Sequence, residues 1–87
     1  MADMDNNQKL LAVVAIMVED ATMVQKVNAL LSEYGGFIVG RMGLPNVRDN
    51  VNVICLVMSA QAEVINALTG KLGSLKGVNA KTLFSKN

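Results

Sequence analysis

The segment "GRMG", residues 40 to 43, carries the clearest potential for chemistry in this sequence of 87 residues. A guanidinium group binds carboxylates and phosphates through paired hydrogen bonds. Glycine inside a strand often marks the close approach of a ligand or of another backbone. We therefore predict a site for a small anionic ligand at the four residues Gly40, Arg41, Met42 and Gly43.

A second interpretation of Arg41 is structural. Its guanidinium would pair with a carboxylate and fix an interface, either within the chain or between subunits. The acidic partners considered within the chain are Glu19, Glu33 and Asp49. The sequence leaves both interpretations open.

Other reactive side chains are scarce. The chain has no histidine and one cysteine, so a thiolate nucleophile would lack a histidine base and most metal chemistry is excluded within a single chain. Cys55 lies in the apolar run "VNVICLVM" and is expected to be a small buried hydrophobe. We predict no catalytic residue, no metal and no cofactor, and hence no enzyme. An iron–sulfur carrier that pools four Cys55 thiolates in a tetramer is disfavoured, because mid-strand cysteines seldom converge on a cluster.

The composition indicates a small protein that needs a partner. Hydrophobic residues make up 52% of the chain and charged residues only 17%, with a net charge of +1. A chain of this size buries only about 60% of its unfolded surface, so surplus aliphatic side chains favour oligomerisation. Its scattered lysines do not form the basic stripe that direct nucleic-acid binding needs. The absence of a long apolar run and the polar start "MADMDNNQK" predict a cytoplasmic protein without membrane contact.

The two halves of the sequence resemble each other. A shift of 38 positions places residues 13–36 over residues 51–74, with six identities in 24 positions. Ordinary composition would give about two. Asn28 matches Asn66, and Gly35 matches Gly73. We expect each matched glycine to end a helix in the left-handed conformation.

The first half is predicted to be a strand, a helix and a return strand. Residues 10–18 form an apolar run of strand length. Asp20 follows and can cap the next helix, because its carboxylate accepts hydrogen bonds from free backbone N–H groups. Apolar residues then recur at three- and four-residue steps, which is the helical period. Residues 37–44 form the return strand.

The second half repeats this plan. A strand is expected at 51–58, Ser59 is the candidate helix cap, and the last strand covers 78–84. Gly70 lies inside the second helix, where glycine costs about 1 kcal/mol relative to alanine, and close helix packing would explain it. Pro45 and the following "NVRDN" are predicted to form a polar loop between the halves.

Two such units predict an α+β fold of the ferredoxin-like βαββαβ type. Its four-stranded antiparallel sheet would carry both helices on one face. Right-handed crossovers place the first and third strands in the centre and the other two at the edges. We expect one domain at 9–86, preceded by a flexible tail at 1–8.

The central strands are apolar on both faces, although a sheet with helices on one side normally has a polar opposite face. The second face is therefore predicted to contact another copy of the chain, in a dimer or a tetramer. The alternation alone does not decide which set of residues meets the helices. We place the interface at Val13, Ala15, Met17, Val53, Cys55 and Val57.

Three motifs together resemble one family. They are "GRMGLP" at 40–45, "INALTGKLGSLKGV" at 65–78 and "KTLFSK" at 81–86. The sequence looks like the small proteins described as regulators of the iron-only hydrogenase system. This resemblance implies a domain similar to ACT domains and to the C-terminal domain of the nickel-responsive repressor, which sense small ligands as oligomers.

The sequence departs from these relatives in two respects. Without histidine, nickel sensing is not carried over, and "VEDAT" replaces the glycine-containing turn of amino-acid-binding ACT domains. The leading hypothesis is a non-enzymatic, ligand-sensing regulatory module of the hydrogenase system. The alternative is an interaction protein that docks on a hydrogenase maturation protein and binds no small molecule.

Overall fold

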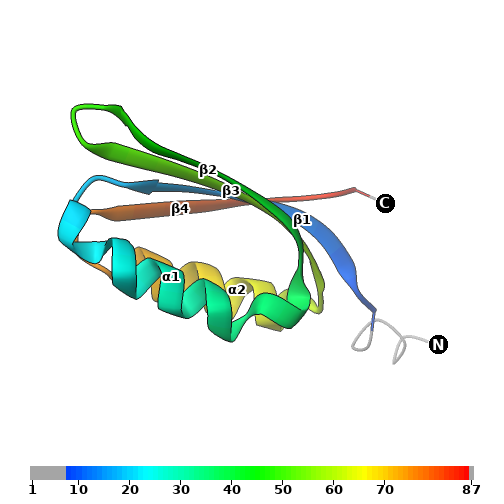
Figure 1. The fold of residues 1–87 in the computed structure, drawn as a ribbon. Helices are drawn as coiled ribbons and strands as arrows, with labels where there is room; N and C mark the ends of the chain where they lie inside the picture. Colours follow the sequence, from blue (N-terminus) through cyan, green and yellow to red (C-terminus); the bar gives the residue numbers. More distant parts are fainter. Residues whose placement is uncertain (1–7, 87) are drawn as a thin grey trace.

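A computed structural model of the chain describes residues 8–86. Four strands form one sheet, and two helices lie together on one side of it (Figure 1). Short 3-10 helices at Ala21–Met23 and Gly35–Phe37 flank the first α-helix. The main elements are β1 (Leu10–Val18), α1 (Val24–Glu33), β2 (Ile38–Arg48), β3 (Val51–Ala60), α2 (Ala62–Gly73) and β4 (Val78–Phe84). Of the predicted tail, residues 1–7 lie outside the described part of the chain.

The sheet has the strand order β2-β3-β1-β4, with antiparallel pairing throughout. This order confirms the predicted ferredoxin-like fold, with β1 and β3 in the centre and β2 and β4 at the edges. Neither helix within residues 8–86 is long and apolar enough to cross a bilayer.

The core lies between the sheet and the two helices. Alternate residues of β1, from Ala12 to Val18, are fully buried, while the residues between them are exposed. Since residues i and i+2 of a strand share one face, this pattern settles which face meets the helices. The helices contribute a matching apolar stripe, which consists of Val27, Leu31, Ile65, Leu68 and Leu72.

The predicted loop between the halves is wrong, because β2 continues through Pro45 to Arg48. A two-residue turn, Asp49–Asn50, then leads directly into β3. Both turn residues have positive φ, 54° and 65°, as a tight hairpin turn with the right-handed twist of its strands requires. Asn and Asp tolerate this conformation better than other non-glycine residues.

Helix capping follows the prediction in the first half only. The Asp20 carboxylate accepts the Thr22 N–H at 3.0 Å and caps the 3-10 turn that leads into α1. Ser59 is not a cap, since it lies within β3 opposite Leu11. The long register between β1 and β3 keeps residues 51–60 extended, and Gln61 occupies the cap position without a side-chain hydrogen bond.

The glycine that adopts the left-handed conformation is not one of the two that were predicted to do so. Gly35 starts a 3-10 turn and Gly73 is the last residue of α2, and neither has positive φ. Among the glycines of residues 8–86, only Gly77 does, with φ of 73°. There the backbone turns from α2 into β4, and the Gly77 carbonyl accepts the Glu19 N–H at 2.7 Å.

Candidate functional site

Arg41 extends toward the helix layer from an edge strand. It lies opposite Leu56, which is buried beneath the helices, so the two side chains share that face of the sheet. The Arg41 guanidinium donates a hydrogen bond of 3.3 Å to Oδ1 of Asn28 in α1. This contact joins β2 to α1, where β2 is otherwise exposed along most of its length.

An open groove of about 210 Å³ lies beside this contact. Gly43 lies opposite Ile54 on the same face of the sheet and forms part of the groove wall. A Cβ added at Gly43 would meet no atom within 4 Å, so the missing side chain leaves free space there. The other residues around the groove are Val24, Asn28, Arg41, Leu44, Pro45, Asn52 and Val53.

A bulge in β2 shapes the far rim of the groove. Leu44 pairs with Val53 and Arg48 with Val51, so residues 45–47 stand opposite Asn52 alone. The backbone N–H of Asn46 donates to Oδ1 of Asn52 at 2.6 Å.

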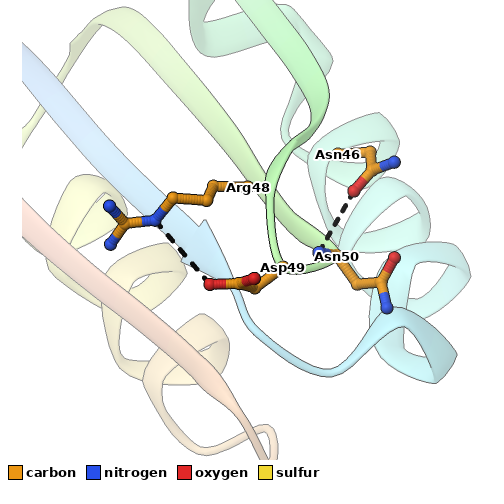
Figure 2. A network of polar contacts seen from close by, with 4 residues as sticks. All are labelled: Asn46, Arg48, Asp49 and Asn50. Atoms are coloured by element: carbon orange, nitrogen blue, oxygen red, sulfur yellow. Dashed lines mark hydrogen bonds and ion pairs between the residues drawn. The ribbon is translucent and has the colours of Figure 1, made fainter.

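The hairpin tip beyond the bulge is held by its own polar side chains. Oδ1 of Asn46 accepts the Asn50 N–H at 3.1 Å, and Nε of Arg48 lies 3.7 Å from the Asp49 carboxylate (Figure 2). The Arg48–Asp49 pair is exposed and contributes little to stability. The two amide hydrogen bonds, in contrast, fix the backbone that carries Pro45 and the groove rim.

The structure divides the four predicted ligand residues between two faces. Arg41 and Gly43 point to the groove side, whereas Gly40 and Met42 lie opposite Val57 and Cys55 on the other face. Within residues 8–86, Arg41 forms no ion pair with Glu19, Glu33 or Asp49, so the alternative of an ion pair within the chain is wrong, while a pair with a neighbouring subunit stays a prediction. Its observed partner is a neutral carboxamide, which leaves the charge available to a ligand.

We use the name open face for the side of the sheet that carries no helix. The six predicted interface residues share this face in three cross-strand pairs, which are Val13 with Val57, Ala15 with Cys55 and Met17 with Val53. The face continues onto the edge strands through Met42, Leu44 and Leu83, all well exposed. Lys81, opposite Ala15, is the charged residue in the rows of these three pairs, and Arg48, opposite Val51, lies at the hairpin end of the face.

Cys55 is a free, half-buried thiol in the middle of the open face. Across the part of the chain that the structure describes, no three His, Cys, Asp or Glu side chains gather where they could hold a metal ion.

The strand order and the helix layer define a small α+β domain with an ACT-like, ferredoxin-like fold. The chain belongs to the TM1266-like family, whose description reads "Iron-only hydrogenase system regulator, putative" and which matches residues 10–82. The solved structure of the uncharacterized protein TM1266 from Thermotoga maritima is 36% identical, with a TM-score of 0.83, over 91% of this chain and 100% of its own. No curated protein matches the sequence.

Two more distant structures support the fold alone. One is the ACT domain of a GTP pyrophosphokinase from Chlorobium tepidum, with a TM-score of 0.61 and 21% identity over 91% of this chain and 89% of that domain. The other is the de novo designed protein Foldit4, with a TM-score of 0.60 and 11% identity over 92% and 99% of the two chains.

Sequence reasoning missed Asn28 and Asn52 as groove residues. The sequence contains a signal for Asn28, because its match to Asn66 in the internal repeat distinguishes this position. Asn52 had none, since its role depends on a bulge in the neighbouring strand.

Proposed function

We propose that the protein is a non-enzymatic regulatory module of the iron-only hydrogenase system. It self-associates through the open face and senses a small anionic ligand at Arg41. The open face is the observation that carries this proposal, and the family description supports the regulatory role.

The open face is largely apolar. Leu11, Val13 and Met17 are each 41–51% exposed, and Leu83 is 72% exposed. Surface patches of this kind mark interaction sites, because apolar area removed from water contributes about 25 cal/mol per Å². A second copy of the chain offers an equally apolar face, and two such faces pack without burying many charges.

Arg41 supplies the sensing part of the proposal. Its charge is not neutralised by a carboxylate within residues 8–86, and it borders a groove with free space. A ligand bound there would contact both β2 and α1, so its binding would be coupled to the position of the edge strand. The cytoplasmic location is also part of the proposal, since a free thiol such as Cys55 suits a reducing compartment.

A docking module is the second candidate function. The open face would then contact a hydrogenase maturation protein, and no small molecule would bind. The exposed apolar surface supports this function as well, so the presence of a ligand separates the two candidates.

A thermal-shift screen against small anions and metabolites tests the proposal. A ligand at one hundred times its dissociation constant adds about 2.7 kcal/mol, on the order of 10–20 °C for a domain of this size. Arg41→Ala should abolish this shift without changing the melting temperature of the unliganded protein. The exposed Arg48→Ala is the matched control and should keep the shift. A screen in which no compound stabilises the protein would favour the docking module.

A further inference from the structure

The hydrogen bonds around the groove fix the direction of two carboxamides. Oδ1 of Asn28 accepts from the Arg41 guanidinium, and Oδ1 of Asn52 accepts from the Asn46 backbone N–H. Guanidinium and backbone N–H groups only donate, so each amide must turn its oxygen toward its partner. Neither NH₂ group donates a hydrogen bond to another group among residues 8–86. The groove thus presents hydrogen-bond donors, and each of its two side-chain amide oxygens already accepts one hydrogen bond.

The charge of the groove is a single positive one. Arg41 is the one ionisable residue among those that line it in the described chain. A ligand that only accepts hydrogen bonds and carries one negative charge matches this set. A carboxylate meets both conditions, and its two oxygens fit the planar fork of a guanidinium. Inorganic phosphate carries more charge near neutral pH and would need further cations.

The remaining walls are apolar and the space is small. Val24, Pro45 and Ile54 border the groove, and Gly43 leaves room between them. Most sites for drug-sized ligands have about 300–1,000 Å³, so about 210 Å³ suits a molecule of only a few heavy atoms. Such a molecule would place a short hydrocarbon body against these three side chains.

We infer that the groove binds a small monocarboxylate with a short aliphatic body. This inference rests on the proposed function, which requires a small anion at Arg41 but does not specify its class. The carboxylate contacts Arg41 and the NH₂ groups of Asn28 and Asn52. The hydrocarbon part lies over the space at Gly43.

A titration of the full-length, ¹⁵N-labelled chain with isovalerate tests the inference. The side-chain NH₂ signals of Asn28 and Asn52 and the backbone signal of Gly43 should shift and saturate. Isovaleramide has the same shape without the charge, and inorganic phosphate has charge without the hydrocarbon. Both should cause much smaller shifts at these signals.

Substitutions on β2 provide matched controls. Arg41→Gln should weaken isovalerate binding by roughly 10- to 100-fold, the usual effect of one charge-assisted hydrogen bond. Gly43→Val should abolish binding, because its side chain would begin in the free space, where an added Cβ meets no atom within 4 Å. Gly40→Val has equal space on the opposite face and should leave the affinity unchanged. The amide spectrum shows in each case whether the variant is folded.

Three results would overturn the inference. They are equal shifts with isovalerate and isovaleramide, unchanged affinity in Arg41→Gln, and no saturable shift with isovalerate. The phosphate arm separates this failure from failure of the proposed function. If phosphate saturates the groove signals and isovalerate does not, the monocarboxylate is wrong while anion sensing at Arg41 stands. If neither anion binds and the thermal-shift screen also finds no ligand, sensing itself is wrong.

Discussion

Gly77 lies in the turn between α2 and β4, and its carbonyl accepts a hydrogen bond from Glu19 in the turn after β1. Replacing Gly77 by alanine should lower the free energy of unfolding considerably. Its φ of 73° is disfavoured for any residue with a Cβ. An added Cβ would lie 2.7 Å from Cβ of Asp20 and 3.2 Å from its backbone nitrogen. Neither atom can move easily, because Asp20 caps the turn before α1 and the adjacent Glu19 N–H donates to Gly77.

The magnitude follows from these two effects. The left-handed conformation costs about 1–2 kcal/mol for a non-glycine residue. Relief of the close contact costs about 1–3 kcal/mol. Reduced freedom of the unfolded chain returns about 0.4–1 kcal/mol. Gly77→Ala should therefore lower the free energy of unfolding by about 1–5 kcal/mol, with a central value of about 3 kcal/mol.

Gly70→Ala is the matched control. Gly70 lies within α2, and its added Cβ would meet nothing within 4 Å, so the predicted close helix packing at this position is wrong. The substitution should stabilise the protein by about 1 kcal/mol, the helix-propensity difference between the two residues. Both variants replace glycine by alanine, but Gly77→Ala should lower the free energy of unfolding and Gly70→Ala should raise it.

Urea unfolding followed by far-UV circular dichroism measures both variants. All samples need one protein concentration, because self-association would shift the midpoint. If Gly77→Ala is as stable as the wild type, the argument from φ and close contact is refuted. A loss in Gly70→Ala equal to that in Gly77→Ala would refute it as well.

Two further predictions concern single polar contacts. Hydrogen bonds from the Thr22 side chain, and then from its backbone N–H, lower the pKa of Asp20, so its carboxylate stabilises the fold above pH 3.8 and this contribution is lost as the pH falls through the lower folded-state pKa. Asp20→Asn should thus lose less stability between pH 5 and 2 in thermal melts. Thr69 and Thr82 share a hydroxyl hydrogen bond of 2.7 Å between α2 and β4. A double-mutant cycle with valine at both positions should give a coupling of about 0.5–1.5 kcal/mol, and additive losses would contradict it.

The sequence predicts most of the fold because the spacing of its apolar residues changes clearly between strands and helices. The apolar run at 10–18 and the last strand at 78–84 coincide with β1 and β4. The hairpin could not be predicted, because proline normally indicates a loop. Pro45 lies instead in a bulge of an edge strand, where a missing N–H breaks no ladder hydrogen bond.

A bulge in β2 decides on which face of the sheet the Arg41 side chain lies, and the sequence does not reveal this bulge. Ile38 pairs with Met58 and Gly40 with Val57, so Val39 is an extra residue in β2. This bulge reverses the alternation of side chains that follow it. Without the bulge, Arg41 would lie on the open face. With it, Arg41 lies on the helix side of the sheet and reaches Asn28.

Self-association through the open face is the central claim, and sedimentation velocity at micromolar concentration tests it most directly. The wild type should sediment as a dimer or a larger oligomer. Val13→Glu places a charge between the apolar neighbours Val57 and Leu83 and should give a folded monomer. Ala29→Glu adds the same charge at an exposed position of α1 and should keep the wild-type mass. A monomeric wild type, or a Val13→Glu variant with the wild-type mass, would contradict the claim.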